Sequence, residues 1–137
     1  MKITQEADYA FRVVFYLSKL GYGEKIEAKV ISEEENIPLR FLLKLLRKLT
    51  QANIIKSYRG VNGGYSLNQM PEDISLKDVI EAIDGPIYIN RCLYNPEECN
   101  LNRTSRCQIH NALAKVQNKL VNELDGITFK DILEKKI

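Results

Sequence analysis

Apolar residues recur at three- and four-residue steps over several stretches of the chain, and this pattern predicts a mostly helical fold. The first predicted helix covers residues 4–20, with Thr4 as its N-terminal cap. Its inward face is formed by Ala7, Ala10, Phe11, Val14 and Leu17. A second, short helix is predicted over residues 28–35, with Val30 and Ile31 inward.

A third helix is predicted from Pro38, whose missing N–H costs nothing at the first helical position, to Gln51. Its buried face is formed by Leu42, Leu45, Leu46 and Leu49. Its opposite face carries Arg40, Leu43, Lys44 and Arg47. A short helix, a tight turn and a cationic second helix are typical of a helix-turn-helix.

Two runs of strand-forming residues, 54–58 and 65–67, lie on either side of an Asn62-Gly63 turn signal, which predicts a β-hairpin. A hairpin behind a helix-turn-helix is a wing, and Arg59 in it is suited to enter a minor groove. A Gly-rich phosphate loop is the competing interpretation. It is disfavoured because no Gly-Lys-Ser/Thr follows and no helix begins there.

The rest of the chain is predicted to be helical on both sides of a polar loop. Ser75 and Asp78 match a capping box ahead of a helix that ends at Gly85. A long helix over 108–124 has an apolar stripe that favours a partner helix, and hence a homodimer. The stripe consists of Ile109, Leu113, Val116, Leu120 and Leu124. Thr128 caps a last short helix.

The predicted fold class is therefore mostly α with a small β-hairpin wing: a winged helix-turn-helix plus a long dimerisation helix. We divide it into a winged domain at 1–86, a cysteine-bearing loop at 87–107, and the dimerisation and C-terminal helices at 108–137. The 45% hydrophobic content suffices for a core, and no apolar run approaches transmembrane length. The N-terminal stretch lacks an apolar segment, so we expect no signal peptide and a cytoplasmic location.

The net charge of +2 says little, but basic residues are concentrated in one part of the chain. No Asp or Glu occurs between Asn36 and Pro71. The basic residues of this stretch are Arg40, Lys44, Arg47, Lys48, Lys56 and Arg59. An ordinary solvated helix face usually mixes both signs, so the stretch indicates a partner with phosphates, such as double-stranded DNA.

All three cysteines and the only histidine lie in the polar stretch from Cys92 to His110. Six residues separate Cys92 from Cys99, seven separate Cys99 from Cys107, and His110 follows two residues further on. Thiols gathered in a polar loop are typical of a zinc or an iron–sulfur site, although the C-x-x-C spacing of zinc knuckles is missing. Inert thiols and a redox disulfide remain the alternatives.

In this order of elements, the chain resembles the Rrf-type regulators, the family of IscR, NsrR and RirA. The resemblance covers nearly the whole chain. It is carried by the opening MKIT…DYA, the helix IPLRFLLKLLRKL, the wing RGVNGGYSL and the three cysteines ahead of a long helix. Members without cysteines respond to small metabolites or protein partners, whereas this chain looks like a cluster-binding member.

The resemblance implies that Cys92, Cys99 and Cys107 ligate a cluster, and it leaves the fourth ligand open. Cys107-x-x-His110 matches the IscR-like pattern, in which the histidine completes a 2Fe–2S site. Asp8 matches the NsrR-like pattern, in which an aspartate of the other subunit completes a 4Fe–4S site. The cysteine spacings fit neither pattern closely. Without a cluster, His110 is a surface residue and Asp8 an acid favoured by the helix dipole.

Two hypotheses of function follow. In the first, the protein is a homodimeric repressor of palindromic DNA sites whose affinity an iron–sulfur cluster sets in response to nitric oxide, oxygen or iron shortage. In the second, it is a winged module in which Cys3His holds structural zinc. An enzyme is disfavoured, since there is one histidine and no cofactor fingerprint.

The expected DNA contacts divide into base contacts and phosphate contacts. Base contacts are expected from Arg40 and Lys44, with Arg47 as a further candidate, and Arg59 is expected in the minor groove. Phosphates are expected to be contacted by Lys2, Lys48, Lys56 and the hairpin. The hairpin residues of this surface are Gly60, Asn62, Gly63 and Tyr65.

Overall fold

The computed structural model describes residues 2–137, so Met1, the first residue of the expected winged domain, lies outside it. The first three helices are α1 (Gln5–Leu20), α2 (Ala28–Glu35) and α3 (Leu39–Gln51). Thr4 caps α1 as predicted, with its side-chain oxygen accepting a hydrogen bond from the Ala7 N–H at 3.1 Å. Pro38 is the N-cap of α3 rather than its first helical residue.

The wing is a two-stranded antiparallel sheet of β1 (Ile55–Tyr58) and β2 (Gly64–Leu67). It is followed by the 3-10 turn η1 (Pro71–Asp73) and by α4 (Leu76–Asp84). The predicted capping box is present, because the Ser75 side chain and the Asp78 side chain each accept the other residue's backbone N–H.

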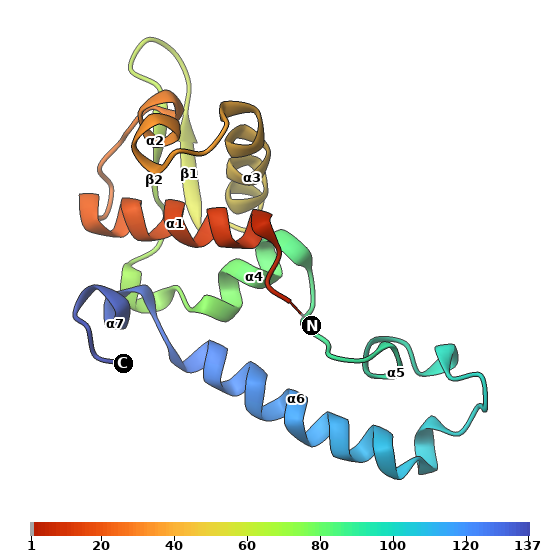
Figure 1. Ribbon diagram of the computed structural model, residues 1–137. Helices are drawn as coiled ribbons and strands as arrows, with labels where there is room; N and C mark the ends of the chain where they lie inside the picture. The colour runs from red at the N-terminus through yellow and green to blue at the C-terminus, as the bar shows by residue number, and fades with distance from the viewer. Residues whose placement is uncertain (1) are drawn as a thin grey trace.

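The cysteine loop contains only short elements, α5 (Arg91–Tyr94), η2 (Pro96–Glu98) and η3 (Thr104–Arg106). The long helix α6 (Gln108–Gly126) and the short α7 (Phe129–Leu133) complete the chain. Figure 1 shows α6 running below the body formed by the other helices, with α5 near its N-terminal end, far from the wing. Within residues 2–137, no helix is both long and apolar enough to cross a membrane.

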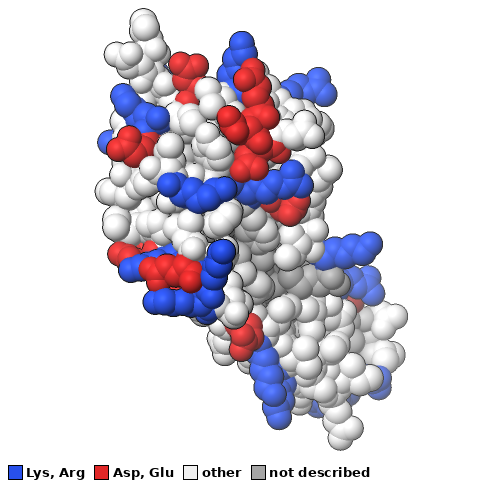
Figure 2. All heavy atoms as spheres, turned by 60° about the vertical axis from the view of Figure 1, so that its left-hand side comes forward, with Lys and Arg blue, Asp and Glu red and all other residues white. Residues whose placement is uncertain are grey.

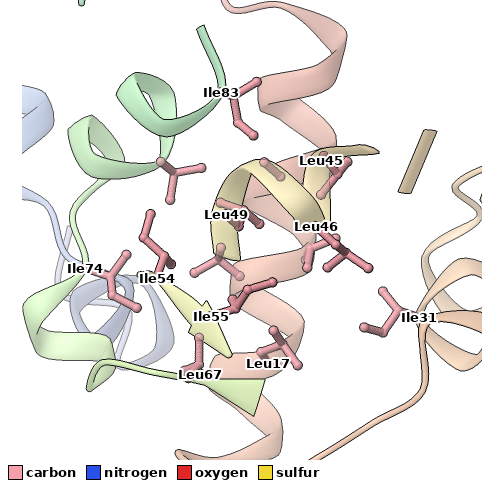
Figure 3. Packing of buried hydrophobic residues seen from close by; sticks show 14 of the residues in the cluster. Leu17, Ile31, Leu45, Leu46, Leu49, Ile54, Ile55, Leu67, Ile74 and Ile83 are labelled. Carbon is pink, nitrogen blue, oxygen red and sulfur yellow. The ribbon is translucent and has the colours of Figure 1, made fainter. Parts of the chain in front are cut away.

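The core lies where α1, α3, the base of the wing and α4 meet. The predicted leucine stripe of α3 is completely buried there, and Figure 3 shows Leu45, Leu46 and Leu49 pointing toward Ile54, Ile55 and Leu17. Of the two residues predicted to point inward from α2, Ile31 is buried whereas Val30 is 36% exposed.

The C-terminal helix packs differently from what its place in the sequence indicates. We grouped α7 with α6, but Phe129 is buried in the core and α7 packs against α1 and η1. The Phe129 N–H donates to the Ile74 carbonyl at 2.9 Å, which holds α7 against the segment ahead of α4. The chain therefore leaves the winged body through the cysteine loop and returns to it after α6.

Candidate functional site

The cysteines and the histidine line one pocket between the loop and the start of α6. Its volume is about 320 Å³. The lining residues are Asn90, Arg91, Cys92, Glu98, Cys99, Asn100, Thr104, Cys107 and His110. A water occupies about 30 Å³, so the pocket has room for a group of several atoms. The folded loop thus brings all four predicted S/N donors to a shared cavity.

His110 connects two of the thiols. Its ring Nδ1 lies 3.1 Å from the Sγ of Cys92, which α5 supplies. Its backbone N–H donates to the Sγ of Cys107, the N-cap of α6, at 3.5 Å. A thiolate at Cys107 would also be stabilised by the positive end of the α6 dipole. The predicted pairing of Cys107 with His110 across one helical turn therefore includes Cys92 as well.

Cys99 lies in a set of backbone donors. Hydrogen bonds from the backbone of Arg103 and then of Leu101 lower the pKa of the Cys99 thiol, and the Thr104 side chain adds to the effect. A lowered pKa favours the thiolate, which is the form that binds soft metals.

The donor set suits a soft metal, and the thiols are available to it. All three cysteines are free and half-buried. Within residues 2–137, however, no three His, Cys, Asp or Glu side chains converge closely enough to hold a single metal ion. Three thiolates and one imidazole are ligands that iron–sulfur clusters and zinc both accept. The residues present thus fit such a group by chemistry and by shared lining.

Asp8, the alternative fourth ligand, does not line this pocket. It lies in the first turn of α1 and forms an ion pair with Arg12 at 3.0 Å. Arg12 also donates to the carbonyl of Glu35 at 3.4 Å, in the turn of the helix-turn-helix.

The outer face of α3 presents three of the predicted basic residues, since Arg40, Lys44 and Arg47 are all exposed. Lys48 has a structural contact that the sequence did not reveal. Its ammonium pairs with Glu6 of α1 and donates to the Ile83 carbonyl of α4 at 3.1 Å. The Nζ of Lys44 lies 3.8 Å from the same Glu6 carboxylate.

The wing tip differs from the two-residue Asn-Gly turn predicted from the sequence. Such a turn needs positive φ at both residues, whereas neither Asn62 nor Gly63 has one. Residues 59–63 form a longer loop, in which Gly60 has φ +92° and its carbonyl accepts the Gly63 N–H at 2.9 Å. Arg59 is exposed in this loop, as predicted.

Two contacts of the wing come from the segment ahead of α2. Lys25 donates from Nζ to the Asn62 carbonyl at 3.2 Å, and Ile26 forms a β-bridge with Tyr65. Lys25 sits among acids in the sequence, so only the hairpin's predicted sharp reversal could have indicated such a contact. Lys56, predicted to contact phosphate, is exposed, and its Nζ lies 5.4 Å from the centre of the Tyr58 ring.

Comparison with known proteins decides the family. Residues 3–135 match the family model Rrf2, described as an iron-dependent transcriptional regulator. The chain belongs to the Rrf2 family. It is therefore a transcriptional regulator that binds DNA, and its winged fold class agrees with the prediction.

Three relatives illustrate the range of Rrf2 proteins that the chain resembles. It is 32% identical to a protein of Rhodobacter capsulatus described as an rrf2-like regulator of helix-turn-helix type, over 96% of this chain and 91% of the relative. The structure of CymR, the global cysteine regulator of B. subtilis, is 28% identical, with a TM-score of 0.69 over 98% of each chain. The structure of T. potens IscR is 24% identical, with a TM-score of 0.73 over 100% of this chain and 89% of the other, and shows the shared fold.

Proposed function

We propose that this Rrf2 protein is a homodimeric repressor whose affinity for its operator is set by an iron–sulfur cluster held by Cys92, Cys99 and Cys107. The observation that carries the proposal is the single pocket of about 320 Å³ that all three thiols line together with His110. A cavity of this size suits a polynuclear group. The description of the matching family as iron-dependent agrees with this choice of metal.

His110 is the fourth ligand that the geometry favours. Its ring already lies against the Cys92 thiol and lines the same pocket, whereas Asp8 is engaged with Arg12. Asp8 would have to reach the pocket of a partner subunit. When bound, the cluster would supply a centre that oxygen, nitric oxide or iron shortage can alter, while the protein residues hold the loop to the start of α6.

The proposed dimer forms through α6. Ile109 and Val116 are 67% and 55% exposed, and Leu113, Leu120 and Leu124 are only half-buried in the single chain. A second α6 would cover this stripe. A symmetric dimer would present two copies of α3 and of the wing to a palindromic site. Arg40 and Lys44 would reach base edges, and Arg59 would enter the minor groove.

Anaerobic purification followed by iron, sulfide and zinc analysis tests the cluster. Native protein is expected to be brown, with iron and sulfide in similar amounts. Cys99→Ser is expected to lose most of both, since Cys99 lines the pocket, whereas Ser105→Ala in the same loop retains them. A colourless native protein with about one zinc per chain would favour the alternative of a structural Cys3His site.

A further inference from the structure

A second concave surface lies between α3 and the wing, far from the cysteines. It has a volume of about 280 Å³. Its lining residues are Leu43, Arg47, Thr50, Gln51, Ser57 and Tyr65. We call it the α3–wing groove. It separates the helix expected in the major groove of DNA from the loop expected in the minor groove.

The wing side of the groove changes from apolar to polar along the strands. Ser57 and Tyr65 are register partners, so their side chains lie next to each other on one face of the hairpin. The next pair on this face, Ile55 and Leu67, is buried in the core. The same face thus anchors the wing at its base and offers hydroxyl groups further out.

The α3 side supplies one cation and one amide. Arg47 and Gln51 are four residues apart, hence neighbours on one face, and both are exposed. Thr50 is used internally, because its Oγ1 donates to the Leu46 carbonyl at 2.7 Å. Arg47 lies on the side of α3 that turns toward the hairpin, whereas Lys44 lies on the side near Glu6. Arg47 is therefore positioned differently from the other cations of the recognition helix.

One positive charge surrounded by neutral donors matches a single DNA phosphate, which carries one negative charge and accepts several hydrogen bonds. In a duplex, the wall between the major and minor grooves is a sugar–phosphate backbone. A protein that places α3 in one groove and Arg59 in the next must therefore accommodate that backbone between the two elements. The α3–wing groove is located there.

We propose that the α3–wing groove binds a backbone phosphate, with Arg47 as its cation and Ser57, Tyr65 and Gln51 as neutral donors. This inference rests on the winged docking of the proposed function and deepens it. Arg47 then positions the protein on DNA and does not read a base. The hydroxyls of Ser57 and Tyr65 fix the separation between the recognition helix and the wing.

The test begins with duplexes that the native protein selects from a random-sequence pool. The tighter-binding of the cluster-loaded and cluster-free forms is then measured by fluorescence anisotropy over a salt series, on a selected duplex and on a scrambled one. Arg47→Gln and Tyr65→Phe are compared with Lys135→Gln, which removes the same charge from the exposed end of the chain. The phosphates of the selected half-site are also replaced one at a time by neutral methylphosphonates.

Arg47→Gln is expected to weaken binding to both duplexes about tenfold or more and to reduce the salt slope by about one per half-site. Tyr65→Phe is expected to weaken binding without changing the slope. Methylphosphonate at one phosphate per half-site is expected to weaken native protein, yet to leave both variants at the affinity they already have. Lys135→Gln is expected to bind as native protein does.

Two results would overturn the inference. If Arg47→Gln relaxes the preference at one base pair and keeps the native salt slope, Arg47 reads a base. If both variants bind like native protein, the groove is empty in the complex. A native protein that selects no duplex would instead remove the docking that the proposed function assumes, so the two failures are distinguishable.

Discussion

At the scale of single residues, the shape of the wing depends on glycines that touch other backbone atoms. A Cβ built on Gly64 would lie 2.6 Å from the Ile26 carbonyl oxygen, and one on Gly63 would lie 2.7 Å from the Tyr58 carbonyl oxygen. Both separations are shorter than real side chains tolerate. The R-G-x-x-G-G-Y wing pattern therefore has a packing reason here, in addition to any contact with DNA.

Gly64→Ala is expected to break the bridge between Ile26 and Tyr65, because the two backbones cannot approach as closely. We expect a loss of about 1–3 kcal/mol in the free energy of unfolding, measured by urea titration. Gly126→Ala is the matched control, since no atom lies within 4 Å of its Cβ, and it should be neutral or slightly stabilising. Equal stability of the two variants would contradict the close contact.

Arg59→Ala is expected to weaken DNA binding by about 1–3 kcal/mol, because Arg59 is the long cationic side chain of the exposed tip loop. Val61→Ala is its control, as Val61 is 100% exposed in the same loop and carries no charge. Anisotropy at moderate salt distinguishes the two. Native affinity in Arg59→Ala would remove this residue from the DNA contact.

At the scale of elements, a single carboxylate joins α1 to the recognition helix. Glu6 pairs with Lys48 and lies 3.8 Å from Lys44, while Lys48 also reaches the end of α4. Basic and acidic side chains are likewise interspersed over the face of the molecule in Figure 2. The basic stretch of the sequence thus has acidic neighbours in space that its own residues could not reveal.

Glu6→Gln is expected to strengthen DNA binding a few-fold, since Lys44, whose side chain is 62% exposed, then meets phosphates or bases without a competing anion. Stability should fall by less than about 1 kcal/mol, because these ion pairs are partly solvated. Glu33→Gln on the exposed side of α2 removes an equal charge and is the control. Weaker binding by Glu6→Gln alone would mean that Glu6 orients Lys44 productively.

The apolar stripe of α6 makes a prediction at the same scale. Leu113→Lys combined with Leu120→Lys is expected to give monomers by light scattering, because two added charges would face each other across the proposed interface. Asn111→Lys combined with Asn122→Lys adds the same charge on roughly the opposite side of the helix and should leave the dimer intact. A leucine double variant that stays dimeric would refute this interface.

The elements themselves were largely predictable from the sequence, for reasons that are local. The α3 stripe and the caps at Thr4, Ser75 and Thr128 depend on residues within one or two turns, and the structure contains each of them. The five-residue wing tip was not predictable, because Lys25 and Ile26 hold it from far away in the sequence. The packing of Phe129 against α1 and η1 is also a long-range choice.

At the scale of the whole molecule, the cysteine loop connects directly to the elements that hold α3. Thr4 donates to Asp84 at 2.9 Å, and Lys48 reaches the adjacent Ile83 carbonyl, just before the loop begins. Further along, the Ile89 N–H donates to Gln117 of α6 at 2.9 Å. A change in the loop therefore acts on both α6 and the support of the recognition helix, which is the coupling that a cluster-controlled repressor needs.

The candidate site was predictable in composition but not in detail. Three cysteines and one histidine in a polar loop indicated a soft-metal site, and the structure brings them to one pocket. The contact of His110 with Cys92 depends on how α5 folds back onto α6, which the spacing of residues does not determine. The choice between a ligand in the same chain and one from a partner subunit is likewise a property of the assembled dimer.

Mixed dimers decide that choice. We expect His110→Ala to lose or alter the cluster spectrum after anaerobic reconstitution, because its ring lines the thiol pocket, and Asp8→Ala to keep it, as Arg12→Ala does.

A dimer of one Cys99→Ser chain and one His110→Ala chain should then contain no intact site, since each pocket lacks a ligand of its own. A dimer of Cys99→Ser with Asp8→Ala gives the discriminating result. If Asp8 acts across the dimer, the intact Asp8 of the Cys99→Ser chain completes the cysteine set of the other chain and restores about half of the native iron, although Asp8→Ala homodimers fail. That recovery, measured by iron content and absorption of doubly tagged dimers, would replace His110 by Asp8 as the fourth ligand.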